Sequence, residues 1–141
     1  MILISHRGNI DGPNKERENS PDYIKEALDL NYDVEIDVWY INKQFYLGHD
    51  RPQYSVEPIF LYDNRLWCHA KNLDALLEMK RLGVHFFWHE YDKFTLTSKR
   101  YVWSYPSDTD YEKTICVLPE LYDFFPKTCT GICSDYISRY K

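Results

Sequence analysis

Short stretches of alternating apolar and polar residues recur along the chain, a pattern that predicts β-strands. The clearest stretch runs from Val34 to Tyr40, where every second residue is apolar and Glu35 and Asp37 lie between. Because side chains two residues apart on a strand point to the same face, Glu35 and Asp37 are expected to lie side by side. Further extended runs are predicted at 2–4, 44–48, 66–71, 85–90, 94–98, 101–105, 114–118 and 131–137.

Two helices are predicted from their end signals. Ser20 can cap free backbone amides, and Pro21 suits a first helical position, where its missing N–H costs nothing. Apolar residues then recur on one face, so a helix is expected over about 21–31. Asn72 caps a second helix, which is expected to end at Gly83, a residue preferred just after a helix. Both helices have the amphipathic pattern of segments that cover a sheet.

The order of strand, helix and strand at the start of the chain favours parallel strands joined by right-handed crossovers. Apart from the short run at 44–48, the predicted strands have eight centres and are expected to be parallel: Ile2, Val34, Leu66, Phe86, Phe94, Val102, Ile115 and Ile132. Eight such strands close a barrel of the triosephosphate isomerase type, which normally needs about 250 residues. We therefore predict an α/β fold, a minimal TIM-type (β/α) barrel in which several outer helices are missing or replaced by loops.

Composition narrows the class of protein. A chain of 141 residues with 44% hydrophobic content closes one core, so residues 1–141 are expected to form a single domain. The net charge is −5 and the basic residues are scattered, which argues against a nucleic-acid binder. No apolar stretch is long enough to span a membrane, and the first residues lack the pattern of a secretory signal. We therefore expect a cytoplasmic protein.

The four cysteines offer little evidence for a metal site in the sequence. Cys129 and Cys133 are the only close pair, and structural zinc sites more often pair cysteines two residues apart, with a second pair or histidines at matching spacing. Reduced, buried thiols are therefore favoured over zinc ligands.

The polar residues at the strand ends suggest chemistry on a phosphate ester. Hydrolysis of a phosphodiester needs charge neutralisation on a phosphoryl oxygen, a base for the nucleophile and an acid for the leaving alkoxide. Histidine exchanges protons near neutral pH, and carboxylate oxygens bind Mg²⁺ or Ca²⁺. The candidates are His6 and His49 for proton transfer, Glu35 and Asp37 for a metal ion, and Arg7 and Lys71 for phosphate oxygens.

Four sequence elements in order resemble the glycerophosphodiester phosphodiesterase family, within the phosphatidylinositol-phospholipase-C-like superfamily. They are His6-Arg7-Gly8, Glu18-Asn19 before a helix, Glu35-x-Asp37, and His49-Asp50. The resemblance covers residues 1–50 well and extends to residue 71. It implies a barrel that hydrolyses phosphodiesters with a divalent metal at the C-terminal ends of its strands.

By this resemblance His6 and His49 are the acid and base, Glu35 and Asp37 are metal ligands, and Arg7 contacts phosphate. On its third strand the family has an acidic metal ligand, then any residue, then lysine. The corresponding residues in this chain are His69, Ala70 and Lys71. As a neutral nitrogen donor, His69 suits Mn²⁺ or Zn²⁺ better than Mg²⁺ or Ca²⁺.

Further candidates come from the same elements. Asn19 is a candidate substrate contact, and Glu18, next to it before the first helix, is a further candidate for the site. The alternative is that both are simply polar residues that precede a helix cap. Of His89 and Glu90, only one can point into the site, and Glu90 is the prediction. Asp135 ends a stretch that looks like the family's last strand.

A small glycerophosphodiester or sugar-linked phosphodiester is the predicted substrate. Two alternatives remain open: a non-catalytic member of the fold that binds phosphate or sugar ligands, and a structural protein that keeps these residues for folding. Where outer helices are absent, strands near 86–105 are expected to expose apolar groups, and such patches usually mark interfaces. This predicts a homodimer.

Overall fold

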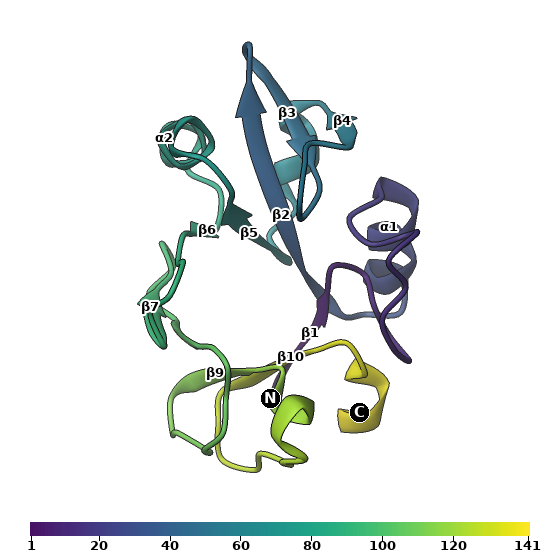
Figure 1. Cartoon of the computed structure of the whole chain (residues 1–141), viewed down its shortest axis with the longest axis vertical. Helices are drawn as coiled ribbons and strands as arrows, with labels where there is room; N and C mark the ends of the chain where they lie inside the picture. The colour runs from purple at the N-terminus through teal and green to yellow at the C-terminus, as the bar shows by residue number, and fades with distance from the viewer.

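The computed structural model describes all residues from 1 to 141. Ten strands form one mixed, curled sheet (Figure 1). The strands that pair in parallel are β1 (Ile2–His6), β2 (Asp33–Ile41), β5 (Leu66–Ala70), β6 (Phe86–Phe87), β8 (Val102–Ser104), β9 (Thr114–Val117) and β10 (Gly131–Ser134). The antiparallel strands are β3 (Gln44–Leu47), β4 (Tyr54–Val56) and β7 (Phe94–Leu96). The main path runs β4-β3-β2-β1-β10-β9-β8-β7, while β5 pairs with β2, and β6 with β5.

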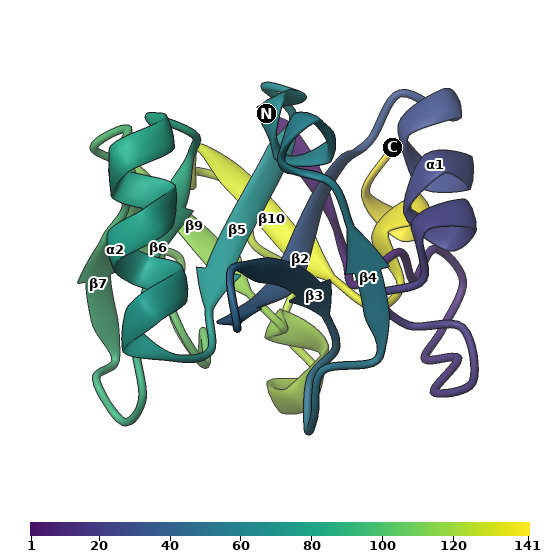
Figure 2. The same cartoon turned by 90° about the horizontal axis from the view of Figure 1, so that it is seen from above.

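The curl of the sheet is incomplete between β6 and β7, where no ladder joins the two strands. Isolated hydrogen bonds cross this gap: the Ser98 N–H donates to the Phe86 carbonyl at 2.8 Å, and the Thr95 hydroxyl donates to the Trp88 carbonyl at 3.3 Å. Figure 2 looks at the molecule from above, with α2 and β5 on the near side and β9 and β10 behind them, across the curl. The fold is therefore a curled half-barrel.

The prediction of a minimal TIM-type barrel is wrong. Only two α-helices are present, α1 (Pro21–Asp29) and α2 (Leu73–Leu82); the other helical segments are the short 3₁₀ turns η1 (Pro58–Tyr62), η2 (Pro119–Tyr122) and η3 (Ile137–Tyr140). The predicted parallel strand at Phe94 is β7, which runs antiparallel to β8. A parallel crossover needs a dozen or more residues, and the short link from Leu96 to Val102 permits only a hairpin.

The helix ends agree with their sequence signals. The Tyr23 N–H donates to the Ser20 side chain, and the Ala75 N–H donates to the Asn72 side chain at 3.0 Å. Gly83 ends α2 with a φ of 74°, a left-handed conformation that suits glycine. Neither helix is long and apolar enough to cross a membrane.

The two faces of β2 are divided as the alternation predicted. Val34, Ile36 and Val38 belong to the largest core cluster, on the outer face of the sheet beneath α2. Glu35 and Asp37 lie on the inner face, and both are buried. A second cluster lines the inside of the curl, from Ile4, Trp67, Phe87, Trp103, Ile115, Val117, Leu118 and Cys133. The polar residues of the inner face therefore sit against an apolar floor.

Candidate functional site

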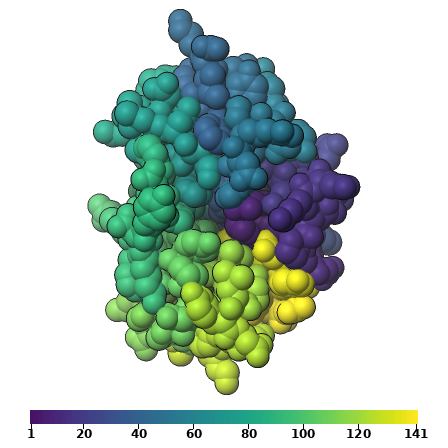
Figure 3. Space-filling model, viewed as in Figure 1, coloured from purple at the N-terminus to yellow at the C-terminus, as the bar shows by residue number.

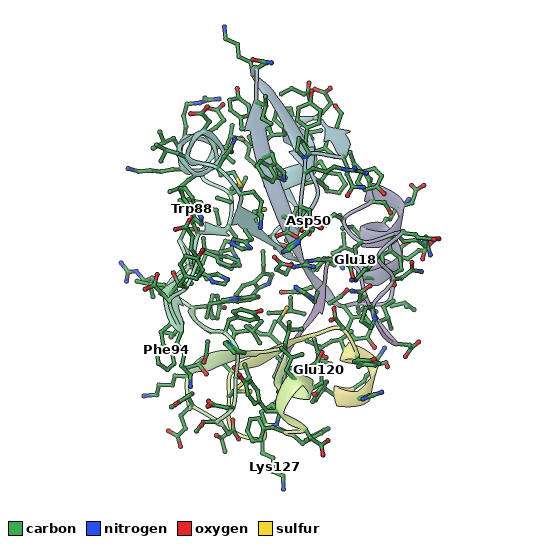
Figure 4. All side chains as sticks on the ribbon, in the orientation of Figure 1. Glu18, Asp50, Trp88, Phe94, Glu120 and Lys127 are labelled. Atoms are coloured by element: carbon green, nitrogen blue, oxygen red, sulfur yellow. The ribbon has the colours of Figure 1, made fainter.

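A cavity of about 510 Å³ opens inside the curl, at the carboxyl ends of β1, β2 and β5. Figure 3 shows the same face of the molecule in space-filling form, and Figure 4 shows the side chains that converge on it. Trp88 lies on one side of this space and Asp50 and Glu18 on the other (Figure 4). The wall is polar along β1, β2 and β5 and aromatic near Trp88, Trp103 and Tyr105.

His6 ends β1 and is anchored by two acidic neighbours. Its Nδ1 donates to Asp135 Oδ1 at 2.7 Å, and its Nε2 lies 3.8 Å from Glu35 Oε2. Burial opposes protonation of the ring, but the hydrogen bond to Asp135 and the charge of Glu35 outweigh it and raise the pKa of His6. Asn9 donates from Nδ2 to both Asp135 (2.8 Å) and Glu18 (2.9 Å). Asn9, which was not among the predicted site residues, therefore holds two of them together.

Asp37 is fully buried and is surrounded by donors. Arg7 Nε lies 3.0 Å from Asp37 Oδ2, and Lys71 Nζ lies 3.9 Å from Oδ1. Asn19 makes two hydrogen bonds: its Nδ2 donates to Asp37 Oδ2, and its Oδ1 accepts from the Asp37 N–H, both at 2.9 Å. Burial favours the protonated acid, but the neighbouring His69 ring and the charges of Arg7 and Lys71 prevail, so the pKa of Asp37 is well below its usual range.

The loop between β1 and α1 is shaped to present these donors. Arg7 and Asn19 both have positive φ values, 56° and 63°. The Arg7 N–H donates to the Glu35 carbonyl at 2.9 Å, and the Asn19 N–H donates to the Arg7 carbonyl at 3.0 Å. Glu18 Oε2 lies 3.4 Å from Arg7 Nη1. The backbone thus fixes both side chains beside Asp37.

Glu35, Asp37 and His69 offer three ligand atoms that all lie within 4.8 Å of one another. His69 Nδ1 is 3.3 Å from Asp37 Oδ1 and 3.7 Å from Glu35 Oε1. Glu35 Oε2 and Asp37 Oδ1 are buried and have no hydrogen-bond partner. Burial, and then the charge of Asp37, raise the pKa of Glu35. Buried carboxylate oxygens without partners are costly, and a cation between them removes that cost.

His69 is held by a stack of parallel rings. Asp37, His69 and Phe87 occupy one row of the sheet register, and the His69 ring stacks on Phe87 at 5.1 Å between centroids. The ring of His89 is parallel to that of His69 at 4.7 Å and lies 6.0 Å from Phe87, so Phe87 and His89 stack side by side against His69. Burial, followed by the charges of His69 and Lys71, lowers the pKa of His89 to about 4.

Glu90 is exposed at the cavity mouth, whereas the neighbouring His89 stacks inside. Glu90 was the predicted inward residue, whereas His89 is the one that points inward. The signal that identifies His89 is the period of two from Phe87, whose side chain belongs to the inner cluster.

His49 reaches the cavity by way of the β2–β3 hairpin. The Gly48 N–H donates to the Asp37 carbonyl at 3.1 Å, so the residue after β3 lies against β2, the strand that carries Glu35 and Asp37. Gly48 has a φ of 152°, and a Cβ there would lie 2.0 Å from the Arg51 carbonyl oxygen. The His49 Nδ1 donates to Asp50 Oδ1 at 2.8 Å, and the side chain remains 42% exposed. His49 is therefore the most accessible of the predicted proton carriers.

The structure brings the predicted residues into one region in two layers. The residues that line the cavity are His6, Arg7, Glu35, His49, His69, Lys71 and Glu90. The residues behind them, which hold these side chains through the contacts above, are Glu18, Asn19, Asp37 and Asp135. The aromatic side of the cavity was not predicted as part of the site.

Comparison with known proteins finds no matching family model, no matching curated protein and no matching solved structure.

Proposed function

We propose that the cavity hydrolyses a phosphodiester with the help of a divalent cation held by Glu35, Asp37 and His69. One observation carries the proposal: two histidines, each anchored through Nδ1 to a carboxylate, share a cavity with two cationic side chains and a preformed group of metal-ligand atoms. These are the parts that phosphodiester hydrolysis needs, namely an acid, a base and charge neutralisation.

The residues present fit a divalent cation. Two carboxylates and one imidazole nitrogen form the donor set, and two of the carboxylate oxygens are buried without partners. The oxygen donors suit Mg²⁺ or Ca²⁺, and the imidazole of His69 shifts the preference toward Mn²⁺. A cation bound there supplies a Lewis acid that polarises a phosphoryl oxygen.

The side chains of the chain supply proton transfer and substrate positioning. His6, with Nδ1 held by Asp135, directs Nε2 toward Glu35 and is the general acid for the leaving alkoxide. His49, with Nδ1 held by Asp50, has Nε2 free to accept a proton from water or from a substrate hydroxyl. Lys71 attracts phosphate oxygens as a point charge, and Arg7 adds a planar set of donors at the same edge.

The cavity favours a small substrate. Its volume of about 510 Å³ holds a glycerophosphodiester or a phosphodiester that carries one sugar. Polar groups of the substrate would face Arg7 and Lys71, and the apolar face of a glycerol or sugar ring would pack against Trp103 and Tyr105. The scattered basic residues and the net charge of −5 favour a small-molecule substrate over nucleic acid.

The test is turnover of an aryl phosphodiester with Mg²⁺, Ca²⁺ and Mn²⁺ in turn, for wild type and for His6→Ala, His49→Ala and Asp37→Asn. We expect metal-dependent turnover, fastest with Mn²⁺ and reduced by about 10²-fold or more in each variant. Lys25→Ala, on an exposed position of α1, is the control and retains the wild-type rate. Wild-type turnover that is independent of metal, or is undiminished in Asp37→Asn, contradicts the proposal.

A second candidate is a non-catalytic module that binds phosphate or sugar ligands in the same cavity. It is favoured by one observation: Asp37 already has Arg7, Asn19, His69 and Lys71 as partners, so its charge is balanced without a metal. If wild type binds phosphate or glycerol phosphate but turns over no diester with any metal, this second function replaces the first.

We also propose a homodimer that uses the outer face of β7, the last strand of the main sheet path. Phe94 and Leu96 are 46% and 65% exposed on one face of this strand, and Phe94 points outward at the edge of the molecule (Figure 4). Sedimentation should give a dimer for wild type and a monomer for Leu96→Asp. Leu77→Asp, on exposed α2, should remain dimeric; a monomeric wild type at micromolar concentration excludes the dimer.

We further propose that the protein is cytoplasmic. All four cysteines are free thiols, which suits a reducing compartment.

A further inference from the structure

A second group of metal-ligand atoms lies on the opposite side of the sheet from the cavity. Asp110, Cys116 and Cys129 each offer one ligand atom, and these atoms all lie within 4.8 Å of one another. Cys116 is on β9, Asp110 is in the loop before it, and Cys129 is in the segment before β10. Both thiols are buried, in a cluster with Ile132 and Ile137.

The pairing of the cysteines differs from the one that sequence spacing suggests. Cys133 is nearest to Cys129 along the chain, but its side chain belongs to the inner cluster with Ile4 and Trp103. The partner of Cys129 is Cys116, thirteen residues earlier, because β9 and β10 are neighbouring parallel strands. The spacing of Cys129 and Cys133, which argued against zinc, therefore has no bearing on this group.

Asp110 is fixed in place by the backbone on which Cys129 lies. Its Oδ2 accepts from the Lys127 and Thr128 N–H groups at 2.6 and 2.7 Å, and its Oδ1 accepts from the Cys129 N–H at 2.9 Å. A carboxylate oxygen has two lone pairs, so Oδ2 is saturated and Oδ1 keeps one lone pair free. Backbone donors of this kind hold the carboxylate in its ionised form.

The thiols have little else to bind. The Cys116 thiol has one hydrogen-bond acceptor, the Thr109 carbonyl, at 3.9 Å, and no cationic side chain forms an ion pair with Asp110. Two sulfur atoms and one oxygen are a ligand set that suits a thiophilic divalent cation such as Zn²⁺.

We propose that Asp110, Cys116 and Cys129 form a structural site for Zn²⁺ or a similar thiophilic cation. Binding releases the two thiol protons and joins the ion to both sulfur atoms and to Asp110 Oδ1, with water in the remaining position. The site is separate from the cavity: Lys127, two residues before Cys129, lies at the lower end of the view in Figure 4, whereas Asp50, next to His49, lies near its centre.

The location explains what such an ion does for the fold. No α-helix follows Leu82, so the outer face of β9 and β10 is covered only by loops and by η2 and η3. An ion bound to Asp110, Cys116 and Cys129 joins the loop before β9, the strand itself and the segment before β10. Small cores with little covering structure are commonly stabilised by such cross-links.

The test uses Co²⁺ as the probe, added to the full chain after reduction and removal of metals. Thiolate ligation gives a near-ultraviolet charge-transfer band that carboxylate and imidazole ligands do not give, so the cavity cannot produce it. We expect this band to saturate at one Co²⁺ per chain. It should be absent in Cys116→Ser and Cys129→Ser and weaker in Asp110→Asn, while Cys133→Ser, a matched buried thiol, and Asp37→Asn keep it.

Zn²⁺ should displace Co²⁺ and raise the melting temperature of wild type and of Asp37→Asn by roughly 5 to 10 °C at a hundredfold excess over the dissociation constant. The absence of a charge-transfer band in wild type overturns the proposal without any variant. A band that persists in Cys116→Ser also overturns it. So does a chain that binds no Co²⁺ but loses the mass of two hydrogen atoms on mild oxidation, because that result identifies Cys116 and Cys129 as a redox pair instead.

Discussion

Asn19 holds Asp37 in place, and its replacement should lower the free energy of unfolding. The side chain is 1% exposed and exchanges two 2.9 Å hydrogen bonds with Asp37. The residue also has a φ of 63°, which asparagine and glycine tolerate better than alanine. Replacement by glycine therefore removes the hydrogen bonds without backbone strain, and replacement by alanine adds the strain.

The two lost contacts set the magnitude. A hydrogen bond to a buried carboxylate contributes roughly 1.5 to 3 kcal/mol, and leaving the Asp37 N–H without a partner costs roughly 1 to 3 kcal/mol. We expect Asn19→Gly to lose about 3 to 5 kcal/mol of the free energy of unfolding, and Asn19→Ala about 1 kcal/mol more, after allowance for the entropy of glycine in the unfolded chain. Losses of this size are a large share of the stability of a small domain.

Urea unfolding followed by tryptophan fluorescence measures these differences, with Asn14→Ala as the control on an exposed residue of the same loop. If Asn19→Gly loses less than about 1 kcal/mol, or if glycine is worse than alanine, the assigned hydrogen bonds and the assigned strain are wrong.

Three further predictions concern other parts of the molecule. His85 is buried, its ring bonds the Thr97 hydroxyl at 2.8 Å, and burial followed by the charge of Lys99 lowers its pKa to about 4. Because the unfolded chain binds the proton more tightly, stability should fall by up to about 3 kcal/mol as pH drops from about 6.5 to 4, and urea unfolding of His85→Gln should show a smaller fall. Asp135→Asn removes the hydrogen bond that raises the pKa of His6, so the alkaline limb of the pH–rate profile should move to lower pH, and an unmoved limb excludes His6 as the acid. Gly48→Ala should lower the free energy of unfolding by about 3 kcal/mol and displace His49, because the new Cβ would lie 2.0 Å from the Arg51 carbonyl oxygen. If the variant has the melting temperature of wild type, the backbone at the end of this hairpin relaxes without cost and the prediction is wrong.

Local signals in the sequence predicted the parts of the molecule that local physics decides. Alternation over β2 placed Glu35 and Asp37 on one face, and the caps at Ser20 and Asn72 located both helices. The link between β2 and β3 is equally local: Asn42 and Lys43 form a two-residue hairpin turn, and both have positive φ, as this type of turn requires. These features depend on a few neighbouring residues, so no tertiary information is needed.

The features that were missed depend on contacts between distant segments. Strand direction after β6 follows from loop length, and counting strand centres without that limit produced a barrel. Asn9 joins Glu18 to Asp135 across more than a hundred residues, and Cys129 meets Cys116 only because β9 and β10 are neighbours. No periodicity or motif in the sequence indicates these contacts between distant residues.

The most direct test of the proposed cation site is the rate of aryl phosphodiester hydrolysis measured against the fraction of chains that carry Mn²⁺. The proposal predicts that the rate rises in proportion to occupancy of one site per chain and falls to background after chelation, with Glu35→Gln and His69→Ala binding Mn²⁺ more weakly. A rate that is unchanged by chelation, or Mn²⁺ binding that is unchanged in both variants, would contradict it.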